Sequence, residues 1–91
     1  MVVLLFGYTK KGGGFMYKIK SENLNELSII SQMQYAEVLG LTNVYINLIF
    51  RGKKSVKLVI AKSIISLAYN ISVRNSEQMQ ELLEKHFTKE N

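Results

Sequence analysis

Side chains that could carry out catalysis are few in this 91-residue chain. The sequence contains no Cys and no Asp, and His86 is its sole imidazole. Carboxylate pairs for acid–base catalysis would have to come from Glu, and one chain cannot assemble a zinc site from several histidines. Metal-free cleavage of RNA needs a base and a phosphate clamp held together, but His86 falls on the apolar stripe of a predicted helix. We therefore expect no enzymatic activity, no catalytic residue, no metal and no cofactor.

Binding of an anion is the chemistry that the side chains favour. The chain carries 12 Lys and Arg against 7 Glu, for a net charge of +5 and an isoelectric point near 9.6. Residues 1–20 and 40–75 contain basic side chains and no acidic ones. This sorting favours DNA or RNA, an anionic membrane surface or an acidic protein as the partner. No run of residues approaches the roughly 18 apolar positions of a membrane-spanning helix. Of these partners we expect DNA or RNA, or a protein, and not a membrane.

Two basic clusters surround predicted glycine-containing turns. Lys10 and Lys11 precede Gly12–Gly14, and the second and denser cluster surrounds Gly52. Basic two-stranded ribbons can enter a groove or follow phosphates. The alternatives are a solvated hairpin tip at the first turn and ordinary solubilising charge, which also protects sheet edges, at the second. The predicted nucleic-acid-binding residues are Lys10, Lys11, Lys18, Lys20, Tyr45, Arg51, Lys53, Lys54 and Lys57.

Tyr45 is included because of its polar neighbours. In a predicted strand it shares one face with Asn43, Asn47 and Arg51. A base can stack on the tyrosine ring while amides and cations bind base edges and phosphates. The alternative is a tyrosine that only packs within a sheet, as tyrosines on strands commonly do.

The elements that must position these residues follow from the hydrophobic pattern, which predicts the order ββα-βββα. The closing helix is the clearest, with apolar spacing through residues 79–87 and a cap at Asn75 or Ser76. Asn23 and Glu26 form a predicted capping box, and Gly40 suits the left-handed residue after a helix. Residues 63–68 fit a strand, a bend or a helical turn. The predicted segments are strands 2–9, 15–20, 43–51, 55–62 and 69–74 and helices 23–39 and 76–87.

The predicted fold class is α+β. We expect residues 1–91 to form a single domain, an antiparallel sheet of four to five strands with two helices packed on one face. The opposite face and the hairpin tips would be basic. The apolar fraction of 47% is high for so small a domain, which favours a homodimer that buries a second apolar face.

The segment YNISVRNSEQMQELLEKHF, residues 69–87, resembles the strand-to-helix closing segment of LAGLIDADG homing endonucleases. The signature helix of that family is absent, and so is an Asp to hold metal. The resemblance therefore implies no endonuclease activity, and only a basic sheet that lies on a duplex.

Together these patterns predict a small, basic, non-enzymatic nucleic-acid-binding protein that contacts phosphates through hairpin turns and a sheet face. The alternative is a protein-interaction module, an inhibitor or adaptor from a virus or other mobile element. Its interface would be the apolar segments Val2–Phe6 and Ile64–Leu67, with lysines at the rim. Because the chain lacks Cys, an intracellular, cytoplasmic location is the default expectation.

Overall fold

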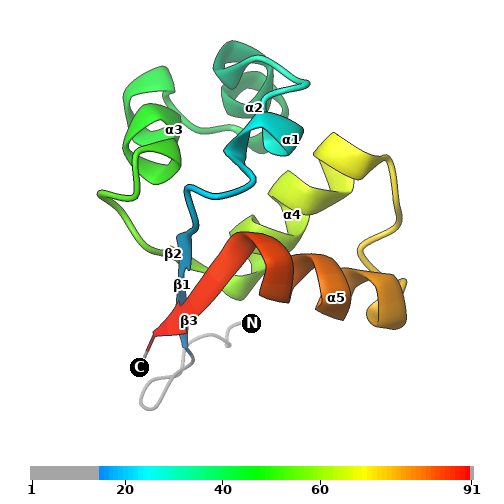
Figure 1. Ribbon diagram of the computed structural model, residues 1–91. Coiled ribbons are helices and arrows are strands. Elements are labelled where there is room, and N and C mark those ends of the chain that lie inside the picture. The colour runs from blue at the N-terminus through cyan, green and yellow to red at the C-terminus, as the bar shows by residue number, and fades with distance from the viewer. Residues whose placement is uncertain (1–14, 91) are drawn as a thin grey trace, which may run out of the picture.

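The computed structural model describes residues 15–90, which form a three-stranded antiparallel sheet and five helices (Figure 1). The strands are Met16–Ile19 (β1), Val56–Lys57 (β2) and Phe87–Glu90 (β3). The helices are Leu24–Leu27 (α1), Gln32–Leu39 (α2), Asn43–Phe50 (α3), Leu58–Tyr69 (α4) and Ser76–His86 (α5). The strand order is β2-β1-β3, so β1 is central. In Figure 1, α2 and α3 occupy one end of the molecule and α5 and β3 the other, with α4 between them.

The predicted sheet of four to five strands with two helices on one face is wrong, although the fold is α+β and the sheet is antiparallel. Residues 43–51 contain α3, and only Val56–Lys57 of the predicted strand 55–62 pairs with β1. Residues 63–68 belong to α4. Residues 69–74 contain the end of α4 and a turn, so the strand implied by the endonuclease resemblance is absent as well. The predicted strand 2–9 and the Gly12–Gly14 turn lie outside the described residues.

The helical period explains why α3 is not a strand. Its buried residues Ile46, Ile49 and Phe50 follow the spacing i, i+3, i+4, which places them on one side of a helix. Thr42 fixes the start, because its side-chain oxygen accepts a hydrogen bond from the Tyr45 backbone N–H at 3.1 Å. Burial in the core overrides the strand preference of the β-branched residues, which is strongly dependent on context.

The predicted helix 23–39 is interrupted. Ser31 caps α2 by accepting a hydrogen bond from the Gln34 backbone N–H at 3.1 Å, so a new helix begins there. The predicted capping box at Asn23 is wrong, because its side chain makes no capping hydrogen bond. Two other predicted caps are confirmed: Gly40 has a left-handed φ of 71°, and the Asn75 side chain caps α5.

The core is built from every helix and from the sheet. Tyr35 is fully buried; its ring lies 5.2 Å from that of Phe50, and its hydroxyl donates to the Leu27 carbonyl at 2.5 Å. On the sheet, Ile19 pairs with Phe87 and both side chains are buried. Strand β3, which the sequence did not predict, therefore joins the end of α5 to the core and holds the chain against β1.

Candidate nucleic-acid interface

Helices α2 and α3 pack together and are joined by Gly40, Leu41 and Thr42. Gly40 takes the left-handed conformation, and the Leu41 N–H then donates to the Ala36 carbonyl at 2.9 Å, which closes α2. Thr42 begins α3 immediately afterwards. Hydrogen bonds thus fix both sides of the turn. Two helices joined by about three or four residues that include a glycine have the connectivity of a helix–turn–helix unit.

Core packing fixes which side of each helix faces solvent. Ala36 on α2 and Ile46 and Ile49 on α3 are buried in the common core. Asn43 at the start of α3 is exposed, and Asn47, one turn later along the helix, is half-buried at the edge of the packed side. Next to them lies Val44, whose side chain is 70% exposed. The outward face of α3 therefore presents amides beside apolar groups.

A hydrogen bond connects this face to the start of α2. The Asn47 side-chain N–H donates to Gln32 Oε1 at 3.2 Å. This bond uses one N–H of Asn47, which retains its own oxygen and a second N–H for other partners. Met33 follows Gln32 on α2 and is 66% exposed, so α2 also presents a large apolar side chain to solvent.

Three cations follow α3 directly. Arg51, Lys53 and Lys54 are exposed, and Gly52 between them has a φ of 72° that reverses the chain. The Lys53 N–H donates to the Leu48 carbonyl at 2.9 Å, so the turn is held against the end of α3. None of the three cations forms an ion pair within residues 15–90. Their charges are therefore available to an external anion.

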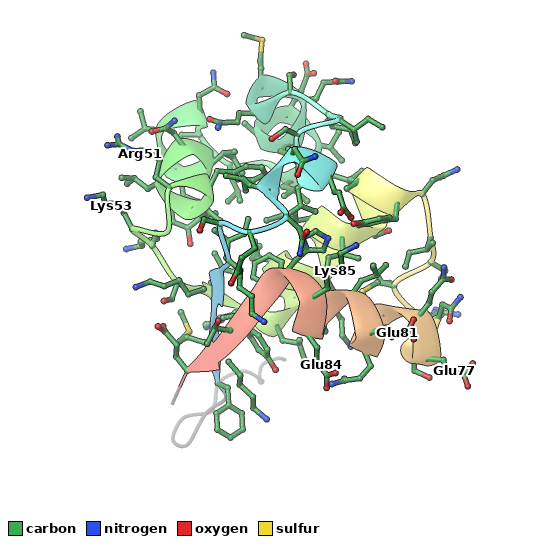
Figure 2. All side chains as sticks on the ribbon, viewed as in Figure 1. Arg51, Lys53, Glu77, Glu81, Glu84 and Lys85 are labelled. Atoms are coloured by element: carbon green, nitrogen blue, oxygen red, sulfur yellow. The ribbon has the colours of Figure 1, made fainter. Side chains whose placement is uncertain are left out.

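Negative charge gathers elsewhere on the molecule. Figure 2 shows Arg51 and Lys53 pointing outward on the α3 side, whereas Glu77, Glu81 and Glu84 line α5 at the far side. The α2–α3 end carries Arg51, Lys53 and Lys54 against the exposed Glu37 of α2, so its net charge is positive. An anionic partner is expected to approach this end.

The structure separates the sequence-predicted residues into groups. Arg51, Lys53 and Lys54 lie together after α3, and Lys57 is exposed on β2, although no hairpin joins them. Tyr45 is half-buried on α3 and packs against the core, so the predicted strand face that would carry it is wrong. Lys10 and Lys11 lie outside the described residues.

Lys18 and Lys20 have partners inside the protein. Lys20 Nζ donates to the Glu84 carbonyl at the end of α5, at 2.8 Å. Lys18 Nζ lies 4.0 Å from a Glu90 carboxylate oxygen. Both lysines stand on or next to β1 and help to join β1 to α5 and β3.

Sequence reasoning missed Gln32, Met33 and Val44 as functional candidates. A signal was present: Gly40 was expected to end a helix, and Thr42 two residues later is a favoured N-cap. Taken together, these residues indicate a second helix that starts at once. The strand-like alternation of residues 44–50 concealed it.

A separate polar cluster joins α1, α4 and α5. The Tyr69 hydroxyl donates to Glu26 Oε1 at 2.6 Å and lies 2.5 Å from His86 Nε2, and Lys85 Nζ donates to Glu26 at 2.7 Å. His86 is fully buried, as the sequence predicted, and burial lowers the pKa of its imidazole. The hydrogen bonds from Lys85 and Tyr69 lower the pKa of the Glu26 carboxyl. The cluster links α1, α4 and α5.

Three further findings concern metal binding, membrane spanning and similarity to known proteins. Among residues 15–90, no three His, Cys, Asp or Glu side chains lie close enough together to hold a metal ion. Nor is any helix in this range long and apolar enough to cross a membrane. Comparison of the chain with models of protein families, with curated proteins and with solved structures found no match.

Proposed function

We propose that this protein binds double-stranded DNA through the α2–turn–α3 unit, with α3 in the major groove. The observation that carries the proposal is the pair of packed helices joined by Gly40–Thr42, with cations at the end of the second helix. In DNA-binding units of this connectivity, the second helix enters the major groove and its N-terminal residues meet base edges.

The dimensions and side chains of α3 support this role. An α-helix with its side chains is about 10–12 Å in diameter, which fits the major groove of B-DNA, and α3 is exposed along part of its length. The exposed residues Asn43 and Val44 occupy its first turn, where base contacts are made. The buried side keeps the helix attached to the core through Ile46, Ile49 and Phe50. The helix can therefore present one face without losing its support.

The cations after α3 supply the phosphate contacts in this proposal. Arg51, Lys53 and Lys54 are exposed at the edge of the unit, where they could reach the DNA backbone on one side of the groove. The acidic α5 is directed away from this end (Figure 2). These residues keep the role expected from the sequence, but they act beside a helix and not at the tip of a basic hairpin.

A homodimer is part of the proposal. An α3 of eight residues covers only a short stretch of base pairs, and helix–turn–helix proteins commonly bind two half-sites as dimers. Two copies would double the basic surface and the base contacts. The expected complex contains two protein chains for each duplex.

A protein-interaction module remains the second candidate, and one observation favours it. Leu58, Val59 and Val73 border a groove and are 37%, 65% and 46% exposed. The apolar interface expected at Ile64–Leu67 is wrong in part, because Ile64 and Ile65 are in the core. Val2–Phe6 lies outside the described residues. A stoichiometric protein partner that survives nuclease treatment, without any affinity for DNA, would support this candidate.

The experiment that tests DNA binding is a fluorescence anisotropy titration of a mixed-sequence duplex from about 50 to about 200 mM salt. The affinity is expected to fall steeply with salt, because bound cations displace counterions. Lys53→Ala with Lys54→Ala should weaken binding and reduce the salt slope. The matched control is Lys18→Ala with Lys89→Ala, which removes the same charge from exposed positions on the sheet. Equal losses in the two double variants would overturn the assignment of the interface to the α3 end.

A further inference from the structure

The outward face of α3 has a restricted chemistry. From Asn43 to Phe50 the helix contains no Arg, Lys, Asp or Glu. Its solvent side offers the exposed amide of Asn43 and the exposed apolar side chain of Val44, with the half-buried amide of Asn47 at the edge. The first cation, Arg51, comes only after the helix ends.

Base edges in the major groove respond differently to such groups. Adenine presents N7 and its N6 amino group, which an Asn or Gln amide can bind with two hydrogen bonds, and thymine presents a methyl group to apolar side chains. Guanine is read mainly by Arg or Lys, and the cytosine amino group by Glu or Asp. The face of α3 therefore holds the partners of adenine and thymine and lacks the usual partners of guanine and cytosine.

The hydrogen bond to Gln32 orients the side-chain amide of Asn47. It leaves Asn47 with one oxygen acceptor and one N–H donor, the pair that binding to adenine requires. Because Gln32 belongs to α2, the bond also restrains the Asn47 amide relative to the first helix of the unit. An amide that is already positioned loses less conformational entropy when it binds a base.

We propose that α3 selects A·T base pairs through the major groove, with Asn43 and Asn47 reading adenine and Val44 contacting the thymine methyl group. Gln32 acts as a positioning residue that orients Asn47. This inference rests on the proposed DNA-binding function, and the two fail in different ways. Absence of binding to any duplex contradicts DNA binding itself, whereas equal binding to all duplexes contradicts only the selection of A·T pairs.

The test uses four short duplexes of one design that differ in base-pair chemistry. One is A·T-rich and one G·C-rich. In the third, inosine·cytosine pairs present the major groove of G·C and the minor groove of A·T; in the fourth, diaminopurine·thymine pairs do the reverse. The A·T and diaminopurine·thymine duplexes should bind about tenfold or more tightly than the other two. Tight binding of the inosine duplex would overturn the proposal, because it would assign the preference to the minor groove or to DNA stiffness.

Single substitutions test which residues cause the preference for A·T base pairs. Asn43 is exposed, so Asn43→Ala should leave the fold intact and reduce the ratio of A·T to G·C affinity. Gln32→Ala should reduce the same ratio by a smaller factor. Lys53→Ala is the control, because loss of a phosphate contact should lower affinity for all four duplexes alike. An unchanged ratio in Asn43→Ala and in Asn47→Ala would overturn the assignment.

The thymine contact has its own test. Replacing thymine by deoxyuridine removes only the methyl group from the groove. The wild-type protein should bind the deoxyuridine duplex several-fold more weakly, and Val44→Ala should respond to the replacement less. A response that is the same in Val44→Ala and in the wild type would remove Val44 from the proposal.

Discussion

The side chain of Asn47 on α3 donates a hydrogen bond to Gln32 Oε1 at the first residue of α2, with 3.2 Å between the two atoms. Both side chains are half-buried, so the bond lies between the core and the solvent face. It joins the first residue of α2 to α3, whereas Gly40 lies at the other end of α2, where the chain turns into α3. The two connections together restrict how α3 can rotate relative to α2, which a base-reading helix needs.

The left-handed turn between the helices should be sensitive to a side chain. At Gly40 a Cβ atom would meet no neighbour within 4 Å, so the cost of Gly40→Ala comes from its φ of 71° alone. We expect a loss of about 1 kcal/mol in the free energy of unfolding, measured by urea denaturation. Gly40→Asn is the matched control and should lose less, because Asn tolerates this conformation better. Equal stability of Gly40→Ala and the wild type would contradict the turn geometry.

Lys20 and Lys18 should differ in their effect on stability although both are basic residues of the β1 region. Lys20→Ala removes the hydrogen bond to the Glu84 carbonyl at the end of α5 and should cost about 1 kcal/mol in chemical denaturation. Lys18→Ala removes a longer, exposed contact to Glu90 and should cost about half of that or less. Neither substitution should change DNA affinity by much more than loss of one charge predicts. A larger loss of DNA affinity in either variant would indicate that β1 is part of the DNA interface.

Stability should decrease as the pH is lowered below neutrality. Burial lowers the pKa of His86 from its ordinary value of 6.5, so the unfolded chain takes up a proton at this residue more readily than the folded one. The stabilisation is therefore complete above about pH 6.5 and is lost as the pH falls through the lowered folded pKa. Glu26, whose pKa is lowered from 4.5 by Lys85 and Tyr69, adds a further loss below that pH.

The measurement is the free energy of unfolding from urea titrations at about pH 7 and about pH 5. His86→Gln cannot take up the proton, so its pH dependence over this range should be weaker than that of the wild type, whatever its stability at pH 7. The quantity compared is the change in the free energy of unfolding between the two pH values, and not its absolute value at either pH. The same slope in both proteins would mean that His86 does not titrate differently in the folded and unfolded states.

The candidate interface was partly predictable because positions 43, 47 and 51 are four residues apart. Residues with this spacing share a face in a strand, where the period is two, and nearly share one in a helix, where it is 3.6. Asn43, Asn47 and Arg51 were therefore grouped together, although the element that carries them was predicted wrongly. Tyr45 distinguishes the two periods: it joins this face in a strand, but packs against the core in α3.

Other parts of the fold were not predictable from local patterns. Gly40 and the Asn75 cap were correct because each depends on neighbouring residues alone. Strand β3 is formed by Phe87–Glu90, a segment of only four residues of which two are charged, and it forms a strand by pairing with β1. Glu26 fitted a capping box but bonds to Tyr69, 43 residues away. Such long-range partners leave no trace in the spacing of residues.

The central claim, that α3 and the turn after it form the DNA interface, is tested most directly by NMR. Amide shifts of the ¹⁵N-labelled protein would be followed during titration with an A·T-rich duplex. The largest changes are expected at Asn43, Val44, Asn47 and the Arg51–Lys54 turn, with the acidic face of α5 at Glu77–Glu84 unchanged. Changes concentrated on the sheet or on α5, with α3 unaffected, would contradict the account.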